Sequence, residues 1–165
     1  MKKTLSILLM VISTQAFAFK VGVIDMEKFM LTIKDGQRIK TTLEKMQEEG
    51  ISTLKKKEAE LLKLNQSYRK QRDLLSKEGR NNKEQELALK SQELQKMQMQ
   101  LERDLMTKEE EMKAPIFKRL ETILKKIAKA RNLDLTVTKQ QNPFVTIKDE
   151  VDISNEAITR YETKK

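Results

Sequence analysis

The sequence predicts an α+β protein that is mostly helical, in which a long antiparallel coiled-coil hairpin is inserted between short strands. Two long segments carry apolar residues at heptad spacing, and nearly all residues between those positions are Lys, Glu, Gln or Arg. Short apolar segments typical of strands lie near both ends of the chain. A narrow apolar seam on charged helices is typical of a coiled coil rather than of a globular core.

Residues 1–18 are predicted to be a secretory signal peptide that is cleaved. Lys2 and Lys3 precede a short apolar stretch, and Ala16-Phe17-Ala18 fits the small-x-small cleavage rule. The stretch is shorter than the roughly 20 apolar residues that are needed to span a bilayer. The alternative is an uncleaved membrane anchor. We expect export, with a mature chain that begins at Phe19.

Residues 19–36 are expected to form the N-terminal strand and a short helix of a compact base. The segment Lys20-Val21-Gly22-Val23-Ile24 has the composition of a short buried strand, and Asp25 ends it. Asp25 can also cap the helical turn or two that follow. Asp35-Gly36 then breaks this helix and opens the first long arm helix.

Residues 37–114 are predicted to form the coiled-coil arm. The first long helix is expected over 37–75 and the second over 83–130, with a hinge at 78–82. At about 1.5 Å per residue such helices reach roughly 60–70 Å. The seam residues are Leu54, Leu61, Leu64, Tyr68 and Leu75 in the first helix, and Leu87, Leu94 and Leu101 in the second.

Two residues interrupt the helical pattern of the arm. Gly50 weakens the first helix by up to about 1 kcal/mol relative to Ala, and it marks either a bend or a tolerated surface position. Pro115 removes a backbone hydrogen bond and is expected to kink the second helix. We therefore expect the coiled part to end near Met112, and residues 115–130 to lean away from it into the base.

Residues 115–165 are expected to complete the base with a helix, strands and a terminal helix. Residues 115–130 are denser in apolar side chains than the arm, which is typical of a helix with more than one neighbour. Leu133, Leu135 and Val137 alternate and are predicted to share one face of a strand. The remaining expected elements are a turn at Asn142-Pro143, a strand at 144–147, and a helix through Tyr161 that Asp152 or Ser154 caps.

The predicted strands are few and short, and they come from both ends of the chain. Three such strands cannot form an independent core within one subunit. We therefore expect oligomerisation, in which strands from several copies complete one sheet or barrel.

The composition excludes most enzyme chemistry. The chain has no Cys and no His, so thiol nucleophiles, His-based acid–base catalysis and the usual zinc sites are absent. The carboxylates lie at helical surface spacing among lysines, which favours a solvated face over a catalytic pair. The four glycines stand far apart, so no glycine-rich phosphate loop is present. We expect no enzyme, no cofactor and no metal site.

The charge favours polyanionic partners. The formal net charge is +9, and removal of Lys2 and Lys3 with the signal peptide leaves +7. Nucleic acid, anionic lipid surfaces, lipopolysaccharide and acidic protein segments all attract such a chain. Export and an aromatic content of 4% argue against nucleic acid, since few side chains are left to stack on bases. Exported proteins and lipid surfaces are therefore the expected partners.

The order of elements resembles that of the OmpH/Skp family of periplasmic chaperones, over essentially the whole mature chain. The terminal elements carry the specific part of the resemblance, because any charged coiled coil would resemble the arms. The matching segments are Val21-Gly22-Val23-Ile24-Asp25-Met26, Lys113-Ala114-Pro115-Ile116, Asn132-Leu133-Asp134-Leu135-Thr136-Val137 and Val151-Asp152-Ile153-Ser154.

The resemblance implies a homotrimer in the periplasm, with a shared β-barrel base and three helical arms around a cavity. It also implies an ATP-independent holdase that keeps unfolded outer-membrane β-barrel proteins from aggregating. A lipopolysaccharide-binding basic patch proposed for some members has no counterpart at 105–111, where Lys108 stands beside three glutamates. The base residues implied by the matching positions are Val21, Val23, Leu133, Leu135 and Val137.

The candidate residues for binding an unfolded protein, or client, lie on the arm. Clustered cations are expected to attract acidic client segments, and methionines can adapt to varied apolar surfaces. The cations can instead form a solvated helix face, and the methionines can belong to the seam. A structural envelope scaffold and a basic nucleic-acid-binding protein are the alternative functions. The candidates are Lys55, Lys56, Lys57, Lys70, Arg72, Met97 and Met99.

Overall fold

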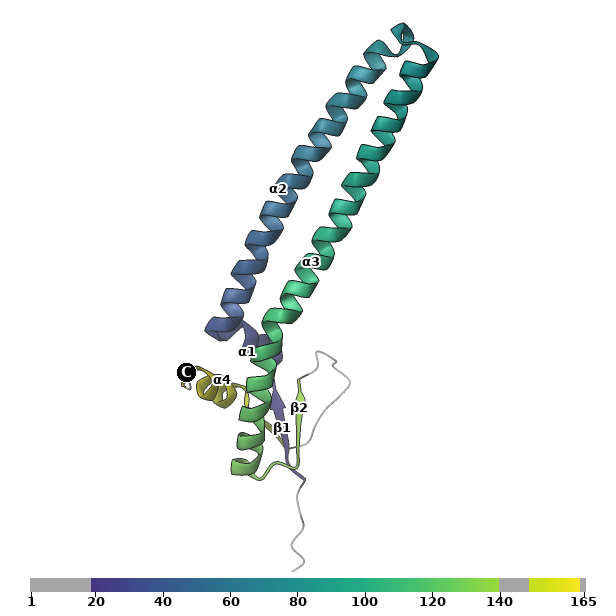
Figure 1. Ribbon diagram of the computed structural model, residues 1–165. Coiled ribbons are helices and arrows are strands. Elements are labelled where there is room, and N and C mark those ends of the chain that lie inside the picture. The colour runs from purple at the N-terminus through teal and green to yellow at the C-terminus, as the bar shows by residue number, and fades with distance from the viewer. Residues whose placement is uncertain (1–18, 140–148, 164–165) are drawn as a thin grey trace, which may run out of the picture.

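The computed structural model describes residues 19–139 and 149–163, which form a helical hairpin on a small α/β base (Figure 1). The prediction of a mostly helical chain with long helices and a few short strands is confirmed. The expected signal peptide, the turn at Asn142-Pro143 and the strand at 144–147 lie outside the described residues. The elements are β1 (Val21–Ile24), α1 (Met26–Thr32), α2 (Lys34–Gln71), the 3-10 helix η1 (Arg72–Leu74), α3 (Lys77–Arg131), β2 (Leu135–Thr138), β3 (Glu150–Asp152) and α4 (Ser154–Thr163).

The three described strands form one parallel sheet in the order β2-β1-β3. Val21 pairs with Leu135 on one side and with Glu150 on the other. Parallel neighbours require a crossover, and here the crossover from β1 to β2 contains the whole helical hairpin. The sequence pattern did not predict β3, because three residues are too few to show a strand period. Pairing with β1 creates this strand.

The core of the base lies between the sheet, α1, the lower part of α3 and α4. Phe29 of α1 meets Tyr161 of α4 edge to face, with ring centroids 5.4 Å apart and ring planes at 87°. The high apolar content at 115–130 is explained because this part of α3 contributes four residues to the buried cluster. The buried cluster consists of Ile24, Phe29, Ile33, Ile39, Ile116, Leu120, Ile123, Ile127, Ile153, Ala157 and Tyr161.

The arm turns earlier than the sequence suggested. α2 ends at Gln71, and α3 begins at Lys77 after η1 and a short turn. Ser76 caps α3, since its Oγ accepts a hydrogen bond from the Gly79 N–H at 3.1 Å. The predicted hinge at 78–82 is therefore wrong, because the Ser76 cap satisfies one of the free N–H groups of the first turn and the helix already includes Gly79.

Pro115 does not end the second arm helix. α3 is continuous over 55 residues and includes Pro115 in its interior. In Figure 1 the lower part of α3 runs at a different angle from the arm, so the helix bends without breaking where it enters the base. This path agrees with the expectation that Pro115 kinks the second helix and that residues 115–130 lean away from the arm into the base.

Gly50 is a point of close helix packing. A Cβ at this position would lie 2.4 and 2.6 Å from the two terminal methyl carbons of Leu101. Neither expected role, a bend or a tolerated surface position, describes this contact. The missing side chain of Gly50 makes room for Leu101 of α3.

Candidate functional site

The arm is held together by the narrow seam that the heptad pattern predicted. Its leucines on both helices are half-buried, whereas most side chains on either side of them are exposed. Near the tip, the buried Tyr68 donates a hydrogen bond to a carboxylate oxygen of Glu84. This hydrogen bond raises the pKa of Tyr68 above its ordinary value. The half-buried seam residues are Leu54, Leu61, Leu64, Leu75, Leu87, Leu94 and Leu101.

The two candidate methionines have different environments. Met97 is half-buried and lines a small gap between the arm helices together with Leu61 and Leu94. Met99 is 49% exposed on α3. Met97 therefore belongs to the seam, and Met99 is available to a partner.

The candidate cations do not converge on one site. Lys55, Lys56 and Lys57 are all exposed on α2, and Lys57 forms an ion pair with Glu60 at 3.7 Å. Lys70 and Arg72 are exposed near the tip. Fifteen residues of helix separate Lys55 from Lys70, which is about 22 Å along the axis. The seven candidates are spread along the arm and do not line one pocket.

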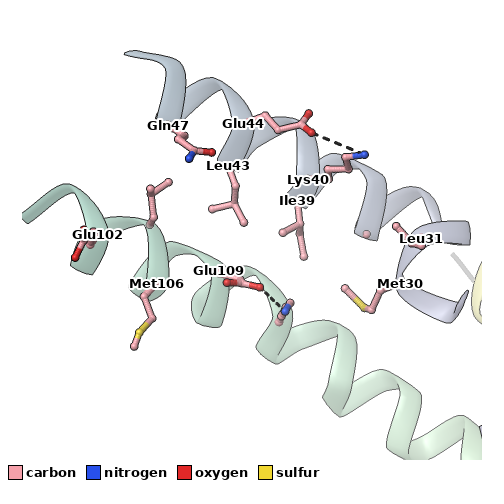
Figure 2. Close-up of a pocket in the computed structure, with 13 residues that line it drawn as sticks. Met30, Leu31, Ile39, Lys40, Leu43, Glu44, Gln47, Glu102, Met106 and Glu109 are labelled. Carbon is pink, nitrogen blue, oxygen red and sulfur yellow. Dashed lines mark hydrogen bonds and ion pairs between the residues drawn. The ribbon is translucent and has the colours of Figure 1, made fainter. Parts of the chain in front are cut away.

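The structure reveals an apolar groove at the root of the arm that the sequence pattern did not predict (Figure 2). Its volume is about 600 Å³, and it lies between α2 and α3 beside α1. In Figure 2, Ile39 and Leu43 of α2 point into the space between the helices. The apolar lining, called the root groove from here on, is formed by Met30, Leu31, Ile39, Leu43, Leu105 and Met106.

Charged side chains border the root groove. Lys40 and Glu44 of α2 form an ion pair at 3.8 Å, and Lys113 and Glu109 of α3 form another. Glu102 of α3 adds a further carboxylate to the lining. The border therefore carries three carboxylates and two ammonium groups, on a chain whose net charge is +9.

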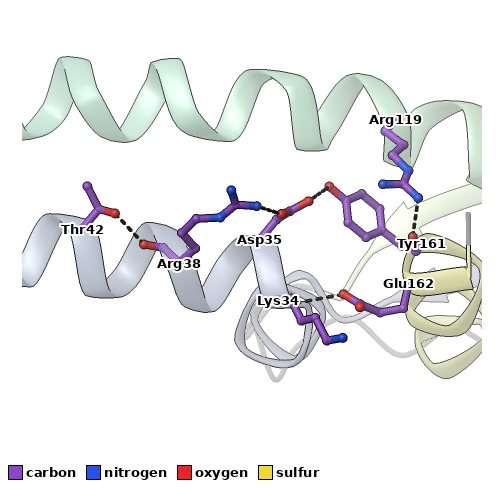
Figure 3. Close-up of polar contacts among 7 residues, drawn as sticks. All are labelled: Lys34, Asp35, Arg38, Thr42, Arg119, Tyr161 and Glu162. Carbon is purple, nitrogen blue, oxygen red and sulfur yellow. Dashed lines mark hydrogen bonds and ion pairs between the residues drawn. The ribbon is translucent and has the colours of Figure 1, made fainter. Parts of the chain in front are cut away.

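A polar cluster joins the terminal helix to the start of the arm (Figure 3). The Tyr161 hydroxyl donates to Asp35 Oδ2 at 3.0 Å, and Arg38 forms an ion pair with the same carboxylate. The guanidinium of Arg119 lies 4.2 Å from the centroid of the Tyr161 ring. Burial, and then the Asp35 carboxylate, raise the pKa of Tyr161 above its ordinary value.

The Lys34 backbone N–H donates to Glu162 at 2.9 Å, which makes a second link between α4 and α2 (Figure 3). These links hold the N-terminal end of α2 against the base. The direction in which the arm leaves the base therefore depends on the last helix of the chain.

Four of the five candidate base residues lie on the sheet, and Leu133 lies just before it. Val21 and Val23 are buried on β1, and their register partners on β2 are Leu135 and Val137. Leu135 is 47% exposed. Leu133 differs from the prediction, since it precedes β2 and packs against the core, where its methyl group would lie 2.6 Å from a Cβ on Gly22. Gly22 and Val21 are neighbours on β1 and therefore face opposite sides of the sheet. Because Leu133 packs on the Gly22 side, it lies on the side away from Val21 and Leu135.

Two kinds of site are not found in the part of the chain that the structure describes. Over residues 19–139 and 149–163, no cluster of three or more His, Cys, Asp or Glu side chains could hold a metal ion. In the same residues, no helix is both long enough and apolar enough to cross a membrane.

Comparison with known proteins identifies the family. A family model described as outer membrane protein (OmpH-like) matches residues 20–161. The chain belongs to the OmpH-like family. The resemblance that the terminal motifs suggested is thereby confirmed. No curated protein matches the sequence.

The OmpH-like fold is also seen in a solved structure from Caulobacter crescentus CB15, described as that of a candidate outer membrane chaperone. The two structures superpose with a TM-score of 0.69 at 9% sequence identity, over 89% of this chain and 86% of that one. At such low identity, the likeness shows that the two proteins share a fold.

The residues of this OmpH-like chain that the sequence pattern did not single out are those of the root groove. Leu31 and Met106 are 57% and 60% exposed. The heptad pattern was the sequence signal available for the arm, and both residues lie outside it. The heptad pattern places each such residue on the solvent face of its own helix and does not show which residues of different helices lie together. Only the approach of α1 to the arm helices places them beside the same space.

Proposed function

We propose that this OmpH-like protein is an ATP-independent periplasmic holdase chaperone. It would bind unfolded outer-membrane β-barrel proteins in a cavity between helical arms and prevent their aggregation. The observation that carries the proposal is the arm itself, a long hairpin whose seam buries little and whose outer faces carry separate apolar side chains among charges. Between the base and the tip, the exposed large apolar residues of the arm helices are Ile51, Leu62, Leu89, Met99 and Met106, and Leu74 is a further one at the tip.

Separate apolar contacts suit a client that has no fixed shape. Each contact contributes little, but several together can hold a chain without the close packing that would select one sequence. Methionine supports this reading because its unbranched thioether side chain adapts to different partners. No nucleotide is needed for such binding, and the protein would act as a binder rather than as an enzyme.

The proposed assembly is a homotrimer built through the base, with a shared barrel of strands. The exposed Leu135 beside the buried Val21 supports it, because an apolar side chain on a strand is expected to be covered. β2 and β3 are both edge strands of the described sheet, so each can pair with a strand of another copy. The number three comes from the family resemblance. Val21, Val23, Leu135 and Val137 would line the shared base.

The charge of the arm supports electrostatic capture at the tip. Residues 63–83 contain seven basic and two acidic side chains. The tip also carries Leu74, which is 88% exposed. Acidic client segments would approach this end first, and contact with an anionic lipid or lipopolysaccharide surface is a further proposal for the same residues. Nucleic acid is not an expected partner of an exported protein.

Export is part of the proposal. We propose that the signal peptide is removed after Ala18, which places the protein in the periplasm. Mass spectrometry of the envelope fraction should find a mature chain that starts at Phe19. A full-length product in the cytoplasm would contradict the location, and would favour the nucleic-acid-binding alternative.

The decisive experiment is an aggregation assay. An outer-membrane β-barrel protein is diluted from urea into buffer without ATP, and light scattering is followed with and without the purified protein. Suppression of scattering at a near-stoichiometric ratio of trimer to client is expected. Unchanged scattering would contradict the holdase function and favour the envelope scaffold.

A further inference from the structure

We infer that the root groove binds large apolar side chains of an extended client segment that carries basic or neutral flanking residues. This inference rests on the proposed chaperone function and names the class of segment that one site on the arm selects. The tip would attract acidic segments, and the root groove would receive segments of a different composition.

Two features of the helix packing give the root groove its shape. At Gly50 the helices lie so close that a single added carbon would meet Leu101. Toward the base, Met30 and Leu31 of α1 stand beside the arm helices, and a space of about 600 Å³ remains. This volume lies within the range of about 300–1,000 Å³ that is common for ligand pockets. It can receive one or two large side chains.

The chemistry of the lining defines the occupant. The walls are aliphatic and methionine side chains, of which Leu31 and Met106 are more than half exposed. Among the described residues, no aromatic side chain lines the groove, and a client ring would meet only flexible or branched apolar groups. An extended segment places alternate side chains on one side, about 7 Å apart, so a client with alternating apolar residues can insert two of them.

The charge around the groove opposes that of the tip. The arm segments 34–50 and 101–113, which flank the groove, contain seven basic and nine acidic side chains. Two border ion pairs neutralise Lys40 and Lys113, and Glu102 is the border carboxylate that forms no ion pair within the described residues. An occupant with acidic flanks would be repelled at this end, and one with basic flanks would be attracted.

The test uses a short synthetic peptide as the probe, because the protein has no Trp. The core of the peptide alternates Trp and Leu with Thr, and its ends carry either Lys or Glu. A blue shift of the peptide Trp emission on titration with the full mature protein reports its transfer into an apolar site. The Lys-ended peptide is expected to bind more tightly than the Glu-ended one, and Glu102→Gln is expected to reduce that difference.

Matched variants locate the site. Met106→Gln and Leu31→Asn alter the groove, and each is expected to weaken peptide binding about fivefold to tenfold, as loss of one apolar contact predicts. Ala88→Gln and Phe117→Asn change exposed apolar residues of α3 that do not line the groove and are not among the proposed client contacts. These control variants should bind the peptide within about twofold of the unaltered protein.

Equal losses in the groove and control variants would overturn the inference, since binding would then be spread along the arm. Unchanged binding in all four variants would also overturn it. The inference would also be overturned if the unaltered protein bound no peptide and Met106→Gln changed the mass in light scattering. Those two results would show that a second copy of the chain covers the groove. The aggregation assay on the unaltered protein is read separately, so failure of the chaperone function remains distinguishable from failure of this site.

Discussion

The contact between Gly50 and Leu101 makes a prediction whose sign depends on the partner residue. Gly50→Ala adds one carbon to the middle of α2, and this carbon would lie 2.4 Å from one methyl carbon of Leu101 and 2.6 Å from the other. Real Cβ atoms do not approach other carbons so closely, so the Leu101 side chain or the helix must move. The same substitution also replaces the residue with the poorest helix propensity after proline.

The two effects are of similar size and opposite sign. Alanine should stabilise the interior of α2 by about 1 kcal/mol relative to glycine. Overpacking at a close contact costs about 1–3 kcal/mol. In the unaltered protein the net effect of Gly50→Ala should therefore lie between neutral and about 2 kcal/mol destabilising. With Leu101→Ala the contact is gone, and Gly50→Ala should stabilise by about 1 kcal/mol. The expected coupling is about 1–3 kcal/mol.

The assay is a double-mutant cycle followed by circular dichroism in urea, at one fixed protein concentration because assembly makes apparent stability concentration-dependent. Ser52→Ala, at an exposed position of α2, is the matched control and should have the same small effect in both backgrounds. If Gly50→Ala stabilised the protein equally with Leu101 and with Ala at that position, the close approach of the helices would be refuted. Gly50 would then be an ordinary surface position.

Three further predictions address the base, the arm and the polar cluster. Leu135→Asp should release monomers in light scattering, because it places an unpaired charge at the proposed subunit contact; an unchanged mass would exclude that contact. Reversal of Lys55, Lys56 and Lys57 to Glu should slow client association in stopped-flow at low salt more than it speeds dissociation, and equal association rates would remove support for electrostatic capture. Tyr161→Phe should cost about 1–3 kcal/mol of stability by leaving Asp35 without this hydrogen bond. The raised pKa of Tyr161 means that its contribution is complete below about pH 10 and is lost as the pH rises further, so the variant should show a flatter decline of stability in that range.

Much of the arm could be predicted from the sequence, because a helix is specified by side chains within a few residues of one another. The heptad positions identified the half-buried seam from Leu54 to Leu101. The turn was misplaced because Gly79 and the asparagines after it resemble a break, whereas the serine cap at Ser76 is a single residue in a polar stretch. Once the Ser76 side chain accepts a hydrogen bond from a free N–H of the first turn, the loss of helix stability caused by Gly79 is too small to end the helix.

The candidate site was harder to predict than the arm. The charged and methionine candidates could be named from the helical pattern. The structure places Lys57 and Met97 at one small gap between the arm helices, but it does not gather the seven candidates into one site. The root groove depends on Leu31, Leu43 and Met106, which belong to three helices. No local pattern indicates that these side chains border one space, because the space exists only where the helices part above the base.

By itself, the sequence determined the helical class, the coiled-coil seam and the membership of the OmpH-like family through its terminal motifs. The tertiary structure decided which strands pair, the path of α3 through Pro115, and the opening of the root groove. It also decided that Tyr161 reaches Asp35 across 126 residues of chain. The physical reason is the range of the interactions: helix periodicity and caps act within one or two turns, whereas pairing, close approach and cavities depend on residues that only the folded chain brings together.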